Sequence, residues 1–239
     1  MRLLLFTKDM GIYRRFISLC NILFDDTLIV FSEDHPRKKD KEYSLFLKKC
    51  QDYNPDIIIS FYYNKIVQRE IINLSSIISV NFHGSILPNY AGSHTINWQI
   101  INGEKESGVT IHTLTNKVDA GNIVMQEKFS IENTDTALDV LLSGIDCSCD
   151  MLEIFYNQIK NGEIFLSKQI LQGGEFVCKK RVPADSMISS DMSPEQVCNL
   201  VRALIPMWPK AFYLDSKNRK VFVENVISKE EAKKILEKI

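Results

Sequence analysis

Short apolar runs alternate with segments of helical spacing along the first part of the chain. The strand-like runs cover residues 3–6, 27–31, 56–61 and 77–83, and the helix-like segments cover residues 13–24, 38–50 and 66–74. Strands that alternate with helices are typical of βαβ units and a parallel sheet. We therefore predict an α/β fold: a Rossmann-like, mostly parallel open sheet with helices on both faces. Such sheets bind ligands at the carboxyl ends of their strands.

Capping residues mark the helix boundaries in the rest of the chain. Thr136 with Asp139, and Ser193 with Gln196, form capping boxes before segments of helical period, and Ser93 is expected to cap another helix. An alternating strand is predicted at 109–114, a β-hairpin at 211–226 and a short helix at 229–239. These patterns predict a main domain over residues 1–190 and a small C-terminal extension over 191–239, made of a helix, a β-hairpin and a terminal helix.

Composition and charge narrow the class of protein. The 239 residues are 45% apolar and 25% charged, with a formal net charge of −1. The apolar fraction is too high for a disordered chain, and the charge disfavours a nucleic-acid binder. No apolar run approaches the roughly 20 residues of a membrane helix, and the first residues are charged too early for a signal peptide. We expect a cytoplasmic protein that binds neither nucleic acid nor membrane.

The motifs of three common kinds of ligand site are missing from the sequence. The six cysteines contain no C-x-x-C pair, so we expect buried, reduced thiols and no metal site. No G-x-G-x-x-G follows the first strand, and no G-x-x-x-x-G-K-[ST] occurs. Their absence disfavours a dinucleotide site and a P-loop.

The most informative stretch is the end of the predicted strand 77–83. Asn81 and His83 are two residues apart on this strand, so their side chains point to the same face. Asn81 offers an amide donor for an oxyanion, and His83 can accept a proton near neutral pH. Asp119, in a later loop, is the best candidate for a carboxylate that orients the imidazole. The spacing alone fits a satisfied polar pair at a strand end equally well. Structural roles are expected for the other histidines, His35, His94 and His112.

Several motifs in a fixed order resemble one enzyme family. Asn81-x-His83 is followed by Ser85-Ile86-Leu87-Pro88, then by Gly108-Val109-Thr110-Ile111 and Asp119-Ala120-Gly121. This order over residues 56–130 is similar to that of the N10-formyltetrahydrofolate-dependent formyltransferases, with Ile86 in place of the usual leucine. Segments 180–185, 200–203 and 208–212 resemble the family more weakly. Ser60-Phe61-Tyr62-Tyr63 and Asn102-Gly103-Glu104 are most similar to the branch that formylates nucleotide-linked amino sugars.

The resemblance implies a reaction that needs no metal and no covalent enzyme intermediate. The catalytic residues would be Asn81, His83 and Asp119: His83 accepts a proton from the attacking amine, Asn81 donates to the oxyanion, and Asp119 holds His83. The folate cosubstrate, N10-formyltetrahydrofolate, would lie against two backbone segments. Their residues are Phe61, Tyr62, Tyr63, Lys65, Ile66, Val67, Val118, Ala120 and Gly121. Without the resemblance, the three aromatic residues of this set fit core packing better.

The acceptor implied by the resemblance is a nucleotide-linked amino sugar. The first candidate is dTDP-4-amino-4,6-dideoxyglucose, in surface polysaccharide (O-antigen) synthesis. A pyrophosphate needs cations and a base needs a flat surface, and the candidate substrate-binding residues are Ser85, Trp98, Lys180, Arg181, Arg202 and Trp208. A solvated or packing role fits these cations and aromatics equally. An isolated hairpin is marginal in water, so the terminal hairpin must pack on the main domain or on a second subunit. Of these two we favour a homodimer through the C-terminal region.

Other functions fit the same residues. Formylation of methionyl-tRNA is disfavoured by the near-neutral charge and the short C-terminal region, and formylation of glycinamide ribonucleotide by the Ser60–Tyr63 segment. The same three residues could hydrolyse formyltetrahydrofolate with water as the nucleophile. A non-catalytic module that binds folate or a nucleotide sugar would not need all three of Asn81, His83 and Asp119. Turnover of the formyl donor alone would indicate the hydrolase, and tight binding without turnover the module.

Overall fold

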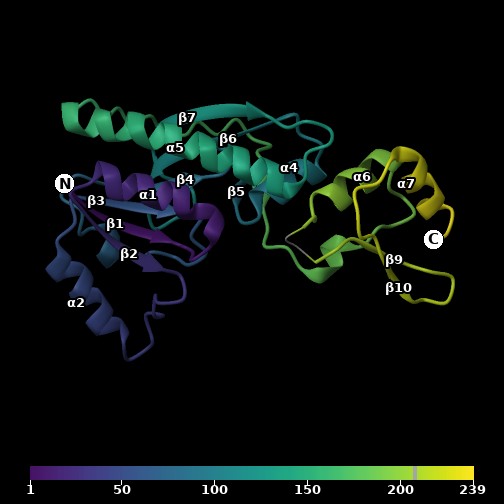
Figure 1. The fold of residues 1–239 in the computed structure, drawn as a ribbon, viewed down its shortest axis with the longest axis horizontal. Helices are drawn as coiled ribbons and strands as arrows, with labels where there is room; N and C mark the ends of the chain where they lie inside the picture. The colour runs from purple at the N-terminus through teal and green to yellow at the C-terminus, as the bar shows by residue number, and fades with distance from the viewer. Residues whose placement is uncertain (207–208) are drawn as a thin grey trace.

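A computed structural model describes residues 1–206 and 209–239. Six strands form the central sheet in the order β2-β1-β3-β4-β6-β7 (Figure 1). Their bounds are β1 (Arg2–Thr7), β2 (Asp26–Phe31), β3 (Ile57–Phe61), β4 (Ile78–His83), β6 (Glu106–Thr113) and β7 (Ile123–Ser130). The first four strands pair in parallel, and β6 and β7 join them antiparallel. The mostly parallel open sheet predicted from the sequence is confirmed.

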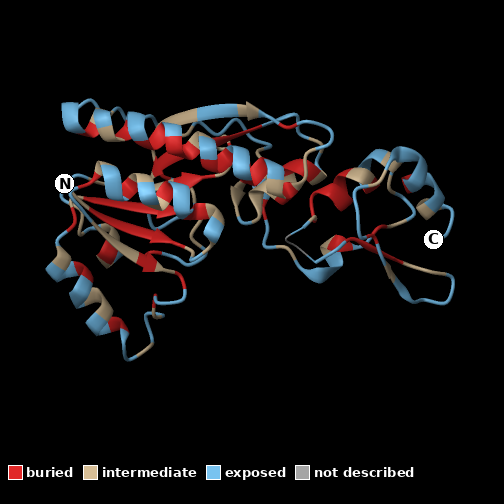
Figure 2. Ribbon diagram, in the orientation of Figure 1, coloured by how far each residue is buried: buried red, intermediate tan, exposed pale blue. Residues whose placement is uncertain are grey.

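Helices cover both faces of this sheet because successive strand residues point to opposite sides. Leu3 and Leu5 pack in one core cluster with residues of α1 and α5, whereas Leu4 and Phe6 pack in another with residues of α2 and α3. The bounds of these helices are α1 (Arg14–Leu23), α2 (Tyr43–Tyr53), α3 (Arg69–Ile72) and α5 (Ala137–Asn161). Figure 2 shows the buried strands lying between the two helical layers.

Two of the three predicted helix caps are present. Thr136 and Asp139 exchange side chain-to-backbone hydrogen bonds at the start of α5, and Ser193 and Gln196 do so at α6 (Pro194–Arg202). The predicted Ser93 cap of α4 (Thr95–Ile101) is wrong. There the N-cap is His94, with φ 61° and no side-chain cap bond. The chain enters α4 through this left-handed residue, which moves the helix start one position along.

Other boundaries also differ from the sequence prediction. The helix expected at 66–74 is only the single turn of α3, and the one expected at 38–50 runs from Tyr43 to Tyr53 as α2. Val67, expected in a helix, lies in a loop and packs into the core with 6% of its surface exposed. Edge strand β7 was not predicted. Most of its residues are partly exposed, so the alternation that marks a half-buried strand is weak.

A C-terminal lobe lies beyond α4, at the end of the molecule far from the N-terminus (Figure 1). It contains α6, β9 (Phe212–Leu214), β10 (Lys220–Phe222) and α7 (Lys229–Leu236). These elements share their own apolar cluster, in which Val197, Tyr213 and Ala232 are buried. The predicted helix and antiparallel hairpin are thus confirmed, while the domain boundary at 190 stays a prediction. No helix in the described ranges is long and apolar enough to cross a membrane.

The segment between α5 and α6 returns to the main sheet before it enters the lobe. Ser167 bridges Ile123 at the start of β7. Farther on, β8 (Val177–Cys178) pairs in parallel with β5 (Ala91–Gly92), and a 3₁₀ turn, η2 (Pro183–Ser186), follows. A second 3₁₀ turn, η1 (Gly11–Tyr13), precedes α1. The segment therefore lies against the loop that follows β4.

Candidate active site

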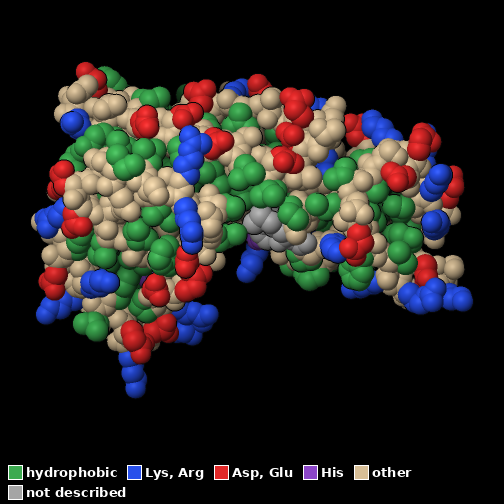
Figure 3. Space-filling view, in the orientation of Figure 1, with side chains coloured by type: hydrophobic (Ala, Val, Ile, Leu, Met, Phe, Trp, Pro, Cys, Tyr) green, Lys and Arg blue, Asp and Glu red, His purple; other side chains and the backbone are tan. Residues whose placement is uncertain are grey.

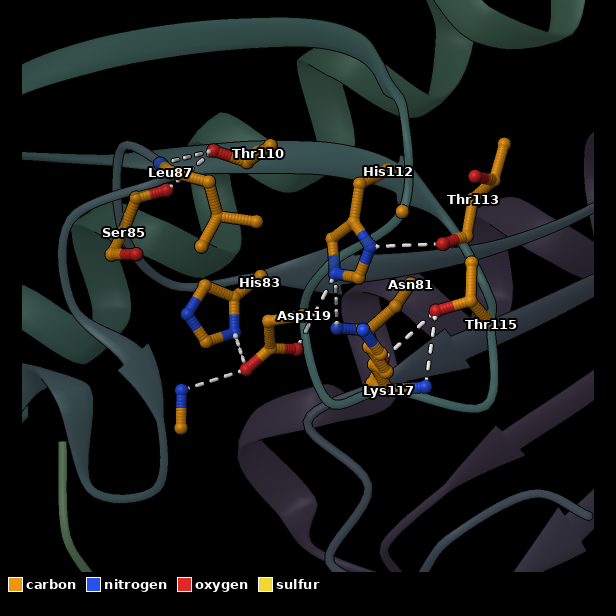
Figure 4. Close-up of polar contacts among 12 residues, drawn as sticks. Asn81, His83, Ser85, Leu87, Thr110, His112, Thr113, Thr115, Lys117 and Asp119 are labelled. Atoms are coloured by element: carbon orange, nitrogen blue, oxygen red, sulfur yellow. Dashed lines mark hydrogen bonds and ion pairs between the residues drawn. The ribbon is translucent and has the colours of Figure 1, made fainter. Parts of the chain in front are cut away.

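Two polar side chains of β4 meet partners on the neighbouring strand β6. The antiparallel register sets Asn81 opposite His112 and His83 opposite Thr110. The Asn81 Nδ2 atom lies 3.1 Å from the His112 Nε2 atom (Figure 4). The pairing of β6 with β7 is irregular between Ile111 and His112, and such a bulge re-aims the side chains next to it. The two strands bring one amide and two imidazoles to the same end of the sheet.

The imidazole of His83 is buried between two acceptors. Its Nδ1 atom lies 3.5 Å from Asp119 Oδ2, and its Nε2 donates to the Tyr90 carbonyl at 2.8 Å. Burial lowers the pKa of His83, and the Asp119 charge and the Tyr90 carbonyl offset this only in part. The ring is therefore neutral at neutral pH, with one proton for two acceptors, and it has the capacity to accept another.

Asp119 reaches the two histidines from the loop after β6. Its backbone is left-handed, with φ 49°, a conformation that aspartate tolerates better than most residues. The Gly92 N–H donates to Oδ2 at 2.7 Å, and Oδ1 lies 3.4 Å from His112 Nε2. Burial by itself raises the pKa of Asp119, but attraction to the nearby His83 and the hydrogen bond from the Gly92 N–H act against burial, and the pKa is lowered. The carboxylate is ionised at neutral pH.

Backbone bonds and one glycine fix the loop that carries Asp119. Gln169 Nε2 donates to the carbonyls of Asp119 and Gly121, at 2.7 and 2.8 Å. The Thr115 hydroxyl closes a tight turn by donating to the Lys117 carbonyl at 2.9 Å. A Cβ atom on Gly121 would lie 1.7 Å from the Thr113 carbonyl oxygen, so only glycine fits this close approach. These contacts hold the loop in the position that sets the Asp119 carboxylate beside His83 and His112.

Ser85 shapes the loop that follows β4. Its hydroxyl is fully buried and donates to the Asn89 carbonyl at 2.9 Å, while its own carbonyl accepts from the Thr110 hydroxyl at 2.6 Å. The same Thr110 oxygen accepts from the Leu87 N–H at 3.1 Å (Figure 4). A contact between the Ser85 hydroxyl and a substrate would need this inward bond to break.

His112 was not among the predicted site residues, because its position in an alternating strand predicted only a structural role. The side chain is 2% exposed and lies within 3.4 Å of Asp119 and 3.1 Å of Asn81. Only the cross-strand register of β4 with β6 marks His112 as part of the site. These two strands are separated along the chain by β5 and α4. His35, expected in a polar loop, is also 2% exposed and hydrogen-bonds to Tyr63 and Gln68.

The predicted folate residues divide into inward and outward side chains. Phe61 stacks on Phe16 with ring centroids 3.7 Å apart, and Tyr62 stacks on Tyr13. The inward side chains are those of Phe61, Tyr62, Tyr63 and Val67, while Gly121 packs closely on the Thr113 backbone. The outward set is Lys65, Ile66, Val118 and Ala120, in which Ile66 is 73% and Val118 67% exposed. A ligand at this rim would meet backbone groups and these outward side chains.

The predicted acceptor residues gather partly around Trp98. Cations stack on its ring, with the Arg181 guanidinium 5.3 Å and the Lys179 ammonium 5.4 Å from the centroid. The indole N–H donates to the Lys179 carbonyl at 2.9 Å. Arg181 is half-buried and also donates to the Asp185 carbonyl at 2.8 Å, whereas Lys180 is exposed. Trp98 and Arg181 are thus brought together.

Arg202 lies elsewhere, between the C-terminal lobe and the main sheet. It is 2% exposed, and its guanidinium donates to the carbonyls of Glu132 and Asp135 at 3.1 and 2.8 Å, and to Asn199 Oδ1 at 3.0 Å. A ligand would have to displace these partners. Trp208 lies outside the described residues. Among the described residues, no group of three or more His, Cys, Asp or Glu side chains could hold a metal ion.

Comparison with known proteins adds to this geometry. Residues 21–144 match the formyl transferase family. The matched region covers more than half of the chain and contains Asn81, His83 and Asp119. The chain belongs to the formyl transferase family. The resemblance read from the sequence is thereby confirmed at the level of the family, and the protein is an N-formyltransferase.

Solved structures share the fold of this formyltransferase along nearly its whole length. A Mycobacterium tuberculosis protein described as a candidate sugar N-formyltransferase matches with a TM-score of 0.76 and 21% identity, covering 95% of this chain and 97% of that one. A 4-N formyltransferase from Francisella tularensis gives 0.73 and 18%, with 95% and 98% covered. HypX from Aquifex aeolicus, in complex with tetrahydrofolic acid, gives 0.69 and 18%, with 94% of this chain but 37% of HypX covered.

Proposed function

We propose that this formyltransferase moves a formyl group from N10-formyltetrahydrofolate to the amine of a nucleotide-linked amino sugar. The observation that carries the proposal is the cluster at the end of β4. There, His83 lies 3.5 Å from an ionised Asp119, and Asn81 projects its amide from the same face of the strand. The fold around it is shared with the candidate sugar N-formyltransferase at 21% identity and with the 4-N formyltransferase at 18%.

His83 is the proposed proton acceptor. The amine nitrogen forms a bond to the formyl carbon, and the bond from that carbon to N10 breaks. The proton lost by the amine goes to His83 Nε2 once the amine replaces the Tyr90 carbonyl there, and it then passes to the departing N10. Once the Tyr90 carbonyl no longer accepts from Nε2, Asp119, which faces Nδ1, favours the Nδ1–H tautomer and stabilises the imidazolium. General base catalysis of this kind contributes about 10²- to 10⁴-fold.

Asn81 is the proposed donor to the oxyanion of the tetrahedral intermediate. Its amide is fixed by the contact with His112 before any substrate arrives. A preorganised donor of this kind is worth about 10²- to 10³-fold in kcat. Positioning of the two substrates on one rigid sheet edge supplies a further part of the rate.

We place the folate donor along the rim after β3 and the loop before Gly121. Ile66 and Val118 expose apolar side chains that a flat pterin ring would cover, and burial of such surface is favourable. The backbone leaves the sheet after Phe61, where β3 ends. This loop carries Asp119, which lies 3.5 Å from His83, so a donor bound here would hold its formyl carbon near the base.

We place the acceptor's nucleotide near Trp98 and Arg181. An indole ring matches a base by stacking, and a guanidinium matches a pyrophosphate by paired hydrogen bonds. The lowered pKa of Arg181, caused by burial and opposed by Asp185, still leaves it cationic. Our first candidate is dTDP-4-amino-4,6-dideoxyglucose, which would place the enzyme in O-antigen synthesis.

The test is mass spectrometry on a panel of dTDP- and UDP-linked amino sugars, with methionyl-tRNA and glycinamide ribonucleotide included. Each acceptor is incubated with N10-formyltetrahydrofolate and either the wild-type protein or a His83→Ala variant. We expect one formyl group to be added to a single sugar and to be lost in the variant. Formylation of the tRNA or the ribonucleotide alone would overturn the sugar assignment. Consumption of the donor with no acceptor modified would indicate a hydrolase.

We further propose a homodimer through the C-terminal lobe. The hairpin leaves Phe222 53% exposed. Figure 3 shows basic side chains gathered at its tip, where Lys217, Arg219 and Lys220 are exposed. Light scattering at micromolar concentration should give twice the chain mass, and Phe222→Asp should shift it towards the monomer. A monomer in the wild type would remove this proposal.

A further inference from the structure

We propose that His112 is a positioning residue that fixes the orientation of the Asn81 amide; this inference rests on the proposed function. His112 and Asn81 are cross-strand partners, and their facing nitrogen atoms lie 3.1 Å apart. His112 is 2% exposed, so water cannot replace this contact. Figure 4 shows the imidazole reaching both Asn81 and Asp119.

The other nitrogen of His112 fixes which tautomer is present. Nδ1 lies 3.1 Å from the carbonyl oxygen of Thr113. A carbonyl only accepts, so Nδ1 carries a proton and donates it. In a neutral ring the lone pair then lies on Nε2, and Nε2 accepts from the Asn81 N–H. The tautomer thus follows from the backbone next to His112.

This acceptor decides which way the Asn81 amide faces. An asparagine amide has two nearly isosteric orientations, and the hydrogen bonds around it select one. With Nε2 as acceptor, one amide N–H points to His112 and the second remains for the oxyanion. A proton on Nε2 would favour Asp119 Oδ1, 3.4 Å away, and would face the Asn81 oxygen instead. The donor would then be turned away from the reaction.

The test uses two substitutions whose side-chain amides stand in for different nitrogen atoms of the imidazole. A glutamine amide reaches roughly as far as Nε2, and an asparagine amide only as far as Nδ1. We expect His112→Asn to lower kcat about 30-fold, with KM within about threefold, because an oxyanion donor is misoriented. His112→Gln restores an acceptor for Asn81 and should stay within about fivefold of wild type.

A matched control separates positioning from simple burial. His35 is equally buried but bonds to Tyr63 and Gln68. His35→Asn should lower the melting temperature like His112→Asn, yet leave kcat within about threefold. The proposal is overturned if His112→Gln loses as much kcat as His112→Asn.

A double-mutant cycle tests the coupling directly. In an Asn81→Ala background there is no amide to orient, so adding His112→Asn should cost less than about twofold in kcat. Full additivity of the two losses would show that His112 acts independently of Asn81 and would overturn the proposal.

The tautomer can be read without any activity. In protein labelled with ¹⁵N-histidine, we expect the His112 signal to show a protonated Nδ1 and an unprotonated Nε2; the signal is assigned by its loss in His112→Gln. A protonated Nε2 would overturn the inference even if the enzyme formylates a sugar. If the enzyme formylates nothing but the tautomer is as expected, the proposed function fails and the structural inference stands.

Discussion

The charged side chains at the catalytic end of β4 and those around Trp98 differ in how far they are exposed to water. At β4, His83, His112 and Asp119 are nearly excluded from water, and each faces a partner at a fixed distance. Around Trp98, Lys179 is exposed and Arg181 half-buried, and both lie over one ring. The first region is a rigid polar cluster inside the fold, and the second is a cationic surface.

This difference assigns different kinetic roles to the two regions. A buried charge interacts in a low dielectric, where a fixed partner has a large effect on the reacting group. Exposed cations are screened by water and salt, so each contributes modestly to affinity. We expect changes at β4 to lower kcat and changes near Trp98 to raise KM for the acceptor.

The largest effect is expected from Asp119→Asn. The amide keeps the shape but can no longer stabilise an imidazolium at His83, and it can donate where the carboxylate accepts. We expect kcat to fall by about 10³- to 10⁴-fold, with KM for the acceptor nearly unchanged. Single-turnover kinetics would measure this, and a loss confined to KM would contradict the comparison of the two regions.

The pH profile of kcat/KM sharpens the same prediction. Transfer needs a neutral His83, and burial holds the pKa of His83 below its usual value. Activity should therefore persist below the ordinary titration range of histidine and fall only at lower pH. Since Asp119 raises the pKa of His83, the residual activity of Asp119→Asn should have its acidic limb at a still lower pH. An acidic limb at higher pH in the variant than in the wild type would contradict this prediction.

A smaller loss is expected from Gly121→Ala. The new methyl group would lie 1.7 Å from the Thr113 carbonyl oxygen, so the loop that carries Asp119 must move. We expect kcat to fall about 100-fold, since displacing a positioned group by about 1 Å has such an effect. Gly11→Ala is the control, because a Cβ there meets no atom within 4 Å. Equal losses in both variants would point to general destabilisation.

The sequence predicted the parts of the site that depend on neighbours along the chain. Alternation along β4 placed Asn81 and His83 on one face, and the capping boxes of α5 and α6 were correct because each is closed within four residues. The apolar runs of β1 and β3 predicted burial on both sides. These features need no knowledge of tertiary contacts.

Features that depend on tertiary contacts were not predictable. His112 becomes part of the cluster only through the pairing of β4 with β6. His94, not Ser93, caps α4, since the chain turns left-handed there. Arginine is a residue type that commonly binds pyrophosphate. The guanidinium of Arg202, however, donates to backbone carbonyls that lie about 70 residues away along the chain. Residue type alone does not separate a ligand-binding cation from a buried one.

A modest effect on affinity is expected from Arg181→Gln. Loss of a half-buried guanidinium on Trp98 should raise KM for the nucleotide sugar about tenfold and leave kcat within about twofold. Lys180→Gln, next to it but exposed, should change KM less than about twofold. Added salt should weaken acceptor binding in the wild type more than in Arg181→Gln. A fall in kcat without a change in KM would place Arg181 with the β4 cluster instead.

The smallest effect on transfer is expected from Arg202→Met, which tests whether this cation belongs to either region. The variant leaves the carbonyls of Glu132 and Asp135 without their donor in a buried site. Such unsatisfied groups should lower the free energy of unfolding by about 2–4 kcal/mol, seen as a lower melting temperature. Both kcat and KM should stay within about twofold at a temperature where the variant is folded. If KM for the acceptor rises and the melting temperature does not change, Arg202 binds the substrate, and the cationic surface near Trp98 extends to the base of the C-terminal lobe.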